Sequence, residues 1–288
     1  MTVREAISQG AAVISKRWDE TPWLDSSVIL ASVLGVSREK LLASYPEPLS
    51  DDNYQIFMEK AAQRAAGSPV AYITEMKEFY GLDFHVDARV LTPRADTEIL
   101  VETVQRTAEE TLSSGCTPKI LDLCTGSGCI AISLKHSIPQ CDIWASDISA
   151  EALDVARMNQ NTLLDSSDKI TFIRTDLFAG IDEKFNIIVS NPPYLTTAET
   201  TTMKESRWPE PALALDGGAD GLDFIRIIIK QAHRNLLPGG SIFFEADPAQ
   251  MKEIRSVMEN NYFSDILIIK DLAGRDRVIT GKLIYGKN

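Results

Sequence analysis

The tetrapeptide Asn191-Pro192-Pro193-Tyr194 contains the residue types needed to bind a planar –NH₂ group. Each proline fixes its backbone φ and lacks an N–H donor, and Pro193 holds the residue before it in an extended conformation. The carbonyl oxygen of Pro192 and the side-chain oxygen of Asn191 can therefore form a fixed pair of acceptors. A –NH₂ group has two protons to donate to such a pair. The ring of Tyr194 offers a flat surface for an amide or a base.

Two acceptors on one nitrogen address a definite chemical problem. An amide or aniline-type nitrogen is a poor nucleophile because its lone pair is delocalised. Accepting both of its hydrogen bonds raises its electron density, and the bonds strengthen as positive charge develops on nitrogen in the transition state. No strong base is required, since the proton leaves after the nitrogen has become acidic. The scattered histidines, His85, His136 and His233, give no support to a hydrolytic triad.

A glycine-containing loop predicts the second substrate. Residues Cys124-Thr125-Gly126-Ser127-Gly128 follow an apolar run and precede a predicted helix at 130–135. Glycine after a strand lets the backbone turn and approach a ligand, and the helix start offers unpaired N–H groups. Asp147 lies 21 residues after Gly126, at the end of the next predicted strand, where a carboxylate can accept both hydroxyls of a ribose. The two signals predict an adenosine-bearing cofactor at the carboxyl edge of a sheet.

The cofactor suggested by this loop is S-adenosyl-L-methionine rather than NAD. Ala131 stands where the dinucleotide fingerprint has its third glycine, a departure that the looser fingerprint tolerates. Asp122, inside the preceding strand, suits a ligand with a positive ammonium and sulfonium better than a pyrophosphate. The pattern from Asp122 to Gly128 resembles motif I of class I methyltransferases. The acceptor pair would then direct a nitrogen onto the methyl carbon, leaving S-adenosyl-L-homocysteine as product.

The elements that must position these groups form an α/β pattern from residue 98 onward. Five short apolar runs separated by helical stretches are typical of a parallel sheet, with 238–240 as a turn before the fifth. The last two runs have no helix between them and predict an antiparallel hairpin at the sheet edge. We therefore expect a seven-stranded, Rossmann-like class I methyltransferase domain at 98–288. Its predicted strands are 119–124, 142–146, 170–174, 186–190, 241–246, 265–270 and 278–285.

The first 97 residues are predicted to form two further parts. Residues 1–66 are helical in pattern, with Pro22 at a helix start, Gly35 at a helix end and a last helix at about 50–66. They predict a small helical bundle that docks the protein substrate. Residues 67–97 form a β-prone, aromatic linker in which the runs 70–73 and 78–84 are interpreted as a hairpin with Gly81 at its turn. Asp96 or Thr97 is expected to cap the next helix.

With these features in place, nearly the whole chain resembles the release factor glutamine methyltransferase family. The segments that carry the resemblance are 67–73, 79–81, 91–98, Asn191-Pro192-Pro193-Tyr194, Glu210-Pro211 and 274–278. The resemblance implies a helical N-terminal domain, a hairpin and a methyltransferase domain. It also implies an enzyme that methylates the side-chain amide of the glutamine in the Gly-Gly-Gln loop of peptide chain release factors.

The resemblance also implies roles for individual positions. The loop from Cys124 to Gly128 would contact the cofactor, Asp147 would hold the ribose and Leu177 would lie near the adenine. Asn191 would touch both cofactor and substrate, and the tetrapeptide would frame the glutamine. Two departures stand out. Cys124 replaces a frequent glycine, so its backbone is expected to stay in a region allowed to L-residues. Glu245-Ala246-Asp247 replaces the more usual Glu-x-Gly.

The composition of the chain limits which partners, cellular locations and cofactors are compatible with it. The chain has 288 residues and a formal net charge of −12, which disfavours duplex DNA as a partner. It has no apolar run near the ~20 residues of a membrane span, no signal-peptide pattern and no metal-ligand spacing. We expect a cytoplasmic monomer with its four cysteines, Cys116, Cys124, Cys129 and Cys141, reduced and mostly buried.

Three other functions stay open at this point. The tetrapeptide is shared with enzymes that methylate the amino group of adenine in DNA or RNA, because the –NH₂ problem is the same. A sibling enzyme that methylates a glutamine of a ribosomal protein is the closer rival. A cofactor-binding adaptor without catalysis is a third reading, but such a protein would not need the side chain of Asn191.

Overall fold

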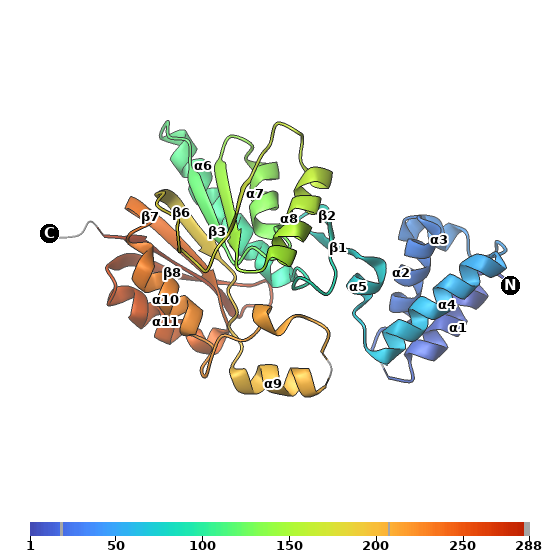
Figure 1. The fold of residues 1–288 in the computed structure, drawn as a ribbon. Coiled ribbons are helices and arrows are strands. Elements are labelled where there is room, and N and C mark those ends of the chain that lie inside the picture. Colours follow the sequence, from blue (N-terminus) through green and yellow to red (C-terminus); the bar gives the residue numbers. More distant parts are fainter. Residues whose placement is uncertain (18–19, 207, 285–288) are drawn as a thin grey trace. The chain divides into compact units, whose positions relative to one another are not determined.

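The computed structural model describes residues 1–17, 20–206 and 208–284 of the chain. The chain divides into two compact units, one of residues 1–76 and 206–209 and the other of residues 77–205 and 210–288. Figure 1 shows helices in the first unit and a sheet flanked by helices in the second. Among the described residues, no helix combines the length and the apolarity that crossing a bilayer requires.

The first unit is helical, and its boundaries follow from local capping. Pro22 occupies the first turn of a helix that ends at Gly35, whose φ of 62° is left-handed, as predicted. Ser50 accepts a hydrogen bond from the backbone of Asn53 and so caps the last long helix. The helices are α1 (Val3–Ile14), α2 (Pro22–Leu34), α3 (Arg38–Ala43), α4 (Asp51–Ala66) and α5 (Val70–Thr74).

A glycine allows the helices of this unit to pack closely. A Cβ on Gly10 of α1 would lie 2.3 Å from the ring of Phe57 on α4, so only glycine fits there. Phe57 is fully buried, and it belongs to a continuous apolar core. That core is built mainly from Val3, Ile7, Ile14, Ile29, Leu30, Leu41, Phe57 and Ile73.

The linker differs in part from the predicted hairpin. Strands β1 (Met76–Phe79) and β2 (Leu82–His85) pair around Gly81, whose φ is 76°. The run 70–73, however, is not a strand but lies in helix α5, because Pro69 starts a helical turn that buries Ile73. β-propensity is a weak guide for such a short segment, and tertiary burial overrides it.

The second unit contains a seven-stranded sheet with the order β5-β4-β3-β6-β7-β9-β8. Neighbouring strands from β5 to β7 are parallel, and β9 is antiparallel to both β7 and β8. The α/β class and the antiparallel C-terminal edge are therefore confirmed. The strands are β3 (Lys119–Leu123), β4 (Asp142–Asp147), β5 (Thr171–Arg174), β6 (Phe185–Ser190), β7 (Leu236–Glu245), β8 (Phe263–Lys270) and β9 (Asp276–Leu283).

Helices cover both faces of the sheet (Figure 1). Helices α6, α7 and α8 lie together on one face, and α10 and α11 lie on the other. Alternate strand residues such as Leu121, Leu123 and Ile188 join the apolar faces of α10 and α11 in one core. The helices of this unit are α6 (Glu98–Ser113), α7 (Cys129–Ser137), α8 (Ala150–Leu163), α9 (Thr197–Glu205), α10 (Asp223–Ala232) and α11 (Met251–Glu259).

Most strand boundaries differ from the sequence prediction by one or two residues, and the start of β7 differs by five. Strand β7 begins at Leu236, so residues 238–240 lie within the strand rather than in a turn before it. Pro238 lacks an N–H donor and Gly239 has a φ of 76°, and the pairing of β7 with β6 shifts its register at this point. The last strand ends at Leu283; Tyr285, where the prediction ended, lies outside the described residues.

The four cysteines are free, and their exposure differs widely. Cys116, in the turn after α6, is exposed, whereas Cys141 is buried. Burial raises the pKa of the thiols of Cys124 and Cys129 to about 12.

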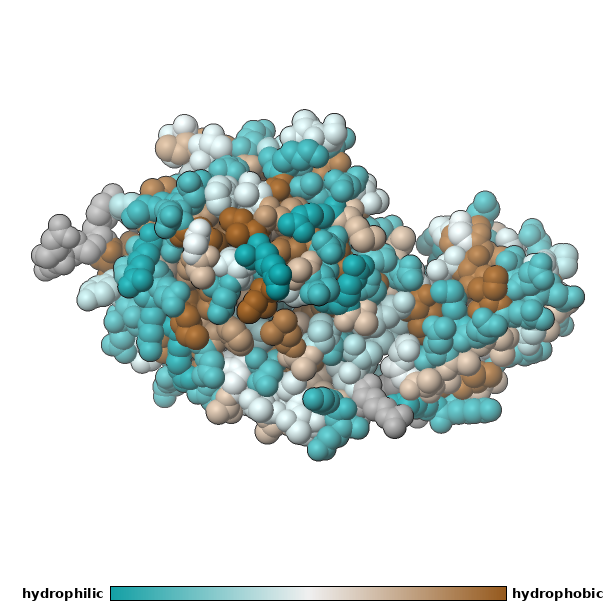
Figure 2. Space-filling model, viewed as in Figure 1, coloured by the Kyte–Doolittle hydropathy of each residue, from teal (hydrophilic) through white to brown (hydrophobic). Residues whose placement is uncertain are grey.

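The face seen in Figure 2 is mostly hydrophilic, with apolar residues in separate patches.

Candidate active site

The carboxyl ends of three adjacent strands form a cleft. Strand β3 lies between β4 and β6, so the segments that follow these strands meet at one edge of the sheet. Five predicted cofactor residues line this cleft: Cys124, Gly126, Asp147, Leu177 and Asn191. The other three predicted residues, Thr125, Ser127 and Gly128, belong to the same loop but do not line the cleft.

The loop after β3 is bent by residues with positive φ. Gly126 and Gly128 have φ values of 55° and 81°, and a Cβ on Gly128 would lie 2.9 Å from the side chain of Ile132. Cys124 has a φ of 60°, in the left-handed region that L-residues rarely adopt. This φ lies in the small left-handed region that remains allowed to L-residues, so it does not contradict the expectation for Cys124. Leu177, another residue of the cleft lining, has a φ of 49°.

Asp147 is fixed by backbone donors on both sides. One carboxylate oxygen accepts from the N–H of Gly126 and the other from the N–H of Ser149, each at 2.9 Å. Burial raises the pKa of this carboxyl, and the backbone hydrogen bonds act in the opposite direction. Each oxygen retains a second lone pair that can accept a further hydrogen bond. The residue can therefore bind two neighbouring hydroxyls in a defined orientation.

Asp122 does not have the predicted position beside a ligand. Its carboxyl is completely buried and does not line the cleft. One of its oxygens accepts a hydrogen bond of 2.6 Å from the hydroxyl of Thr125, in the loop that follows β3. Burial raises the pKa of this carboxyl to about 7. Asp122 thus holds the loop through Thr125 and does not face the ligand. Side chains along a strand point alternately to the two faces of the sheet, and the side chain of Asp122 points to a face that is covered by helices.

Replacing Asp122 with asparagine should make folding stability less dependent on pH. The carboxyl titrates near 3.8 in the unfolded chain and near 7 in the folded one, so its neutral form favours folding at low pH. That contribution is lost as pH rises through 7. Relative to wild type, Asp122→Asn should gain up to about 4 kcal/mol of unfolding free energy between pH 4 and pH 8. Urea titrations at both pH values measure it, with the exposed Asp165→Asn as control; a pH-independent difference would contradict the prediction.

The tetrapeptide after β6 is held in place by close backbone contacts. A Cβ on Gly217 would lie 2.6 Å from the carbonyl oxygen of Pro193, and one on Gly221 would lie 2.1 Å from that of Tyr194. The carbonyl of Tyr194 also accepts a hydrogen bond of 2.9 Å from the side chain of Gln250. In the part of the chain that the structure describes, no donor bonds the carbonyl oxygen of Pro192. This acceptor is therefore available to a ligand.

The side chain of Asn191 makes one polar contact with the residues that the structure describes. Its Nδ2 donates to the hydroxyl of Thr97 at 3.2 Å, so its oxygen is turned away from that partner. Neither Thr97 nor Asp96 caps α6, contrary to the prediction: the backbone of Thr97 is already helical at that point and its side chain makes no capping bond. The Thr97 hydroxyl instead accepts a hydrogen bond from Asn191, the first residue of the tetrapeptide.

A second cavity adjoins the cleft. It is lined by three tetrapeptide residues, Asn191, Pro192 and Tyr194, and by Arg94 and Glu210. Asn191 lines both cavities and so lies where they meet. Glu210, whose side chain is almost fully buried, accepts hydrogen bonds from the backbone N–H of Thr92 and from the guanidinium of Arg94. The second cavity is completed by Leu91, Leu195, Met203, Ala214 and Leu215.

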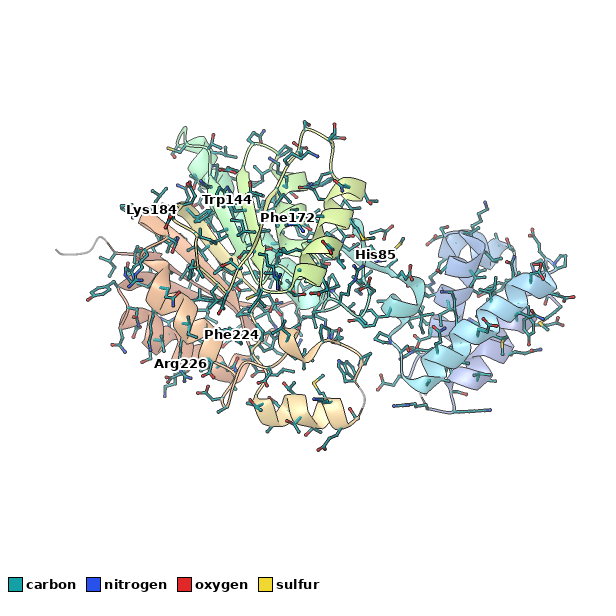
Figure 3. The ribbon with its side chains drawn as sticks, in the orientation of Figure 1. His85, Trp144, Phe172, Lys184, Phe224 and Arg226 are labelled. Carbon is teal, nitrogen blue, oxygen red and sulfur yellow. The ribbon has the colours of Figure 1, made fainter. Side chains whose placement is uncertain are left out.

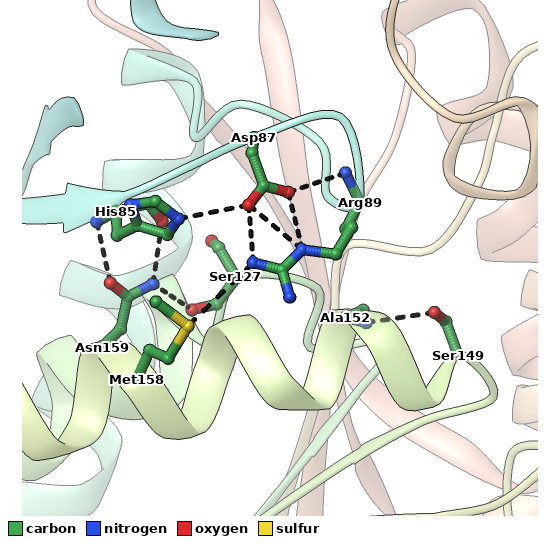
Figure 4. Close-up of polar contacts among 8 residues, drawn as sticks. All are labelled: His85, Asp87, Arg89, Ser127, Ser149, Ala152, Met158 and Asn159. Carbon is green, nitrogen blue, oxygen red and sulfur yellow. Dashed lines mark hydrogen bonds and ion pairs between the residues drawn. The ribbon is translucent and has the colours of Figure 1, made fainter. Parts of the chain in front are cut away.

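The segment after the hairpin contributes Arg89, Val90 and Leu91 to the cleft lining, and Figure 4 shows the polar contacts around Arg89. Asn159 of α8 bonds both backbone groups of His85 and the carbonyl of Ser127, so it ties strand β2 to the cofactor loop. Asp87 binds the guanidinium of Arg89 through both oxygens, and Arg89 lines the cleft. The Arg89 side chain lowers the pKa of Asp87 well below its usual range.

Several lining residues were not foreseen. Ile148 and Ser149 directly follow Asp147, so the strand end itself could have indicated them. Phe224, at the start of α10 (Figure 3), and Leu213 come from distant segments and carry no local signal. The lining also includes Val90, Leu91, Ser146, Ala152, Thr175, Asp176, Pro211 and Ala214, together with Pro193 of the predicted tetrapeptide.

Known proteins resemble this chain to different degrees. The family model for the methyltransferase small domain matches residues 95–208, and that for the PrmC N-terminal domain matches residues 5–74. The chain is 37% identical to the release factor glutamine methyltransferase of Burkholderia pseudomallei, over 90% of this chain and 92% of the relative. It is 36% identical to the same enzyme of Clostridium acetobutylicum, over 97% and 98%. A solved ribosomal protein L11 methylase from Lactobacillus delbrueckii is 22% identical, with a TM-score of 0.49, over 69% of this chain and 84% of that one.

Fold, cleft and tetrapeptide together define a methyltransferase of the α/β type, as the sequence predicted. Within that class, the relatives that match nearly the whole chain identify its family. It belongs to the release factor glutamine methyltransferase family, which confirms the resemblance found in the sequence.

Proposed function

We propose that this protein transfers a methyl group from S-adenosyl-L-methionine to the side-chain amide of the glutamine in the Gly-Gly-Gln loop of peptide chain release factors. The observation that carries the proposal is the position of Asn191, at the junction of two cavities. A methyl donor in one cavity and an amide in the other would meet at this residue. The names of the curated relatives support the choice of acceptor.

The cleft has the chemistry that the cofactor requires. The two oxygens of Asp147 match the two hydroxyls of a ribose, and apolar side chains such as Ile148, Leu177 and Phe224 suit a flat adenine ring. When bound, S-adenosyl-L-methionine supplies a methyl group activated by a sulfonium. Cys124 and Gly126, also in the lining, bring the loop backbone close to the ligand.

The tetrapeptide would bind and orient the acceptor amide. The side-chain oxygen of Asn191 and the carbonyl of Pro192 accept one proton each from the glutamine –NH₂, and Tyr194 packs against the amide plane. The two acceptors would orient the nitrogen toward the cleft in which the methyl donor would bind. As the N–C bond forms and the S–C bond breaks, the nitrogen gains positive charge and binds both oxygens more strongly. It then loses one proton to water.

The N-terminal unit and the cellular setting complete the proposal. Residues 1–66, which make up most of the helical unit, are proposed to dock the release factor. The chain is proposed to act as a monomer in the cytoplasm, where translation takes place. Exposed apolar side chains on this unit, including Trp23, Leu24 and Leu42, suit a protein partner. The chain's net charge of −12 weighs against a nucleic-acid acceptor.

Mass spectrometry of the methylated product tests the function. The chain is incubated with labelled methyl donor and, separately, with a release factor, ribosomal proteins and DNA. We expect label on the glutamine of the Gly-Gly-Gln loop and none on a release factor whose glutamine is replaced by alanine. Label on a ribosomal glutamine or on adenine instead would assign one of the rival acceptors. A chain lacking residues 1–66 should lose activity on the whole release factor if that unit docks it.

A further inference from the structure

A glutamine side chain in the second cavity needs a hydrogen-bond donor as well as two acceptors. The oxygens of Asn191 and Pro192 would hold its –NH₂ group, but its carbonyl oxygen can only accept hydrogen bonds. On entering the cavity this oxygen loses its bonds with water, and a buried oxygen without a new partner weakens binding. The acceptors of the tetrapeptide therefore account for only half of a side-chain amide.

Several donors in the walls of the second cavity already have partners. The backbone N–H groups of Leu195, Ala214 and Leu215 donate to backbone carbonyl oxygens. The Nδ2 group of Asn191 donates to a threonine hydroxyl at 3.2 Å, and the hydroxyl of Tyr194 donates to a buried carboxylate at 3.4 Å. These groups are therefore poorly placed to bind the carbonyl oxygen of an entering amide.

Arg94 brings unused donors to the same cavity. Of the lining residues that the structure describes, it is the one lysine or arginine. Its Nη2 donates to Glu210, whose side chain is 1% exposed and also accepts the backbone N–H of Thr92 at 3.1 Å. A guanidinium carries five N–H donors, and no described residue accepts a hydrogen bond from Nε or Nη1 of Arg94. One end of this guanidinium is thus anchored while the rest is open to a ligand.

We propose that Arg94, held in place by Glu210, donates a hydrogen bond to the side-chain carbonyl oxygen of the acceptor glutamine. The proposal rests on the proposed function, since it assigns a further contact to the same acceptor group. The cavity has a volume of about 130 Å³, so a group bound in it lies close to all of its walls. Arg94 and Asn191 both line this space, and one amide can therefore contact both of them.

The contact with Arg94 strengthens binding and does not speed the chemical step. A cation beside the carbonyl oxygen favours the delocalised form of the amide, in which the nitrogen shares its lone pair. It does not make the nitrogen a better nucleophile. Because the bond already exists in the bound substrate, its loss should raise the KM for release factor and leave kcat within about threefold of wild type. The oxygen of Asn191 differs in acting mainly in the transition state.

The enzyme variant has to remove the cation without leaving its partner charged and buried. Arg94→Met alone would deprive the carboxylate of Glu210 of its counter-charge, which destabilises a fold. The test variant is therefore the double substitution Arg94→Met, Glu210→Gln. The single variant Arg94→Gln, whose –NH₂ can still donate to Glu210, is a second test. The matched control is Arg106→Met, Glu102→Gln, because this pair, joined at 2.9 Å on α6, lines neither cavity.

Binding to three forms of the release factor tests the contact. They carry glutamine, glutamate or methionine at the acceptor position, and S-adenosyl-L-homocysteine is present so that no methyl group is transferred. Glutamate keeps an oxygen for Arg94 but has no –NH₂, and methionine has neither group. Calorimetry should show that Arg94→Met, Glu210→Gln weakens binding of the glutamine and glutamate forms by about 10- to 10²-fold. Binding of the methionine form should stay within about twofold.

The pattern across the three forms decides the result. Arg94→Gln should reproduce the pattern, and the control pair should leave all three affinities unchanged. Equal weakening of all three forms would place the contact of Arg94 elsewhere on the release factor, and undiminished binding of the glutamine form would exclude a contact; either would overturn the proposal. Failure of the proposed function is recognised in the wild-type enzyme, which would then bind the glutamine and methionine forms equally and transfer no label to the release factor.

Discussion

Replacing Asn191 by alanine should lower kcat for methyl transfer by at least about 10²- to 10³-fold, the loss expected when one preorganised hydrogen-bonding group is removed. The substitution deletes one of the two oxygens that would hold the acceptor nitrogen. The loss concerns the transition state more than the bound substrate, because the charge on nitrogen develops only as the bond forms. Single-turnover assays with release factor and labelled methyl donor measure it.

The cofactor affinity provides the internal control for Asn191→Ala. Asn191 is one of many residues lining the cleft, so calorimetry should show S-adenosyl-L-methionine binding weakened by no more than a few fold. A circular dichroism spectrum like that of wild type would show that the fold is retained. Near-normal turnover in the variant would contradict the mechanism with two acceptors.

Replacing Asp147 by alanine should weaken the binding of S-adenosyl-L-methionine by about 10²- to 10⁴-fold. Hydrogen bonds to a charged group contribute about 1.5–3 kcal/mol each, and two hydroxyls would lose their acceptor. The variant also leaves the N–H groups of Gly126 and Ser149 without their partner, which loosens the loop. Asp147→Asn, which keeps one acceptor oxygen, should lie between alanine and wild type.

The control for Asp147 is an acidic residue on the adjacent helix. Asp154 lies on α8, and its side chain is 65% exposed and paired with Arg157, so Asp154→Ala should leave the affinity unchanged. Calorimetric titrations with both S-adenosyl-L-methionine and S-adenosyl-L-homocysteine measure the effect, since both carry the ribose. An unchanged affinity in Asp147→Ala would assign the ribose contact to another group.

Much of the fold was predictable because its signals are local. Short apolar runs, the glycines of the loop and the Pro-Pro pair each restrict the backbone within a few residues. The α/β class, the antiparallel edge and the placement of Asp147 and Asn191 at one sheet edge follow from such restrictions. The run 70–73 was misassigned because a strand and a single helical turn of that length look alike in sequence.

The supporting side chains could not have been predicted in the same way. Thr97 and Asn191 are 94 residues apart, and only the packing of α6 against the sheet brings them together. Asp122 looked like a ligand contact because the sequence shows its position along the strand but not what covers its face. Glu245 was noticed only as part of an unusual tripeptide, since nothing local marks the contact with Tyr194.

The uneven exposure of the cysteines makes this chain suitable for selective chemical labelling. Thiolates react with maleimides, and thiols with pKa values of about 11 or 12 at Cys124, Cys129 and Cys141 are almost entirely protonated at neutral pH. Cys116 is exposed in the turn after α6 and does not line the cleft. Maleimide labelling at neutral pH is therefore expected to favour Cys116 over Cys124, Cys129 and Cys141, so that a fluorophore can be placed mainly at one native position.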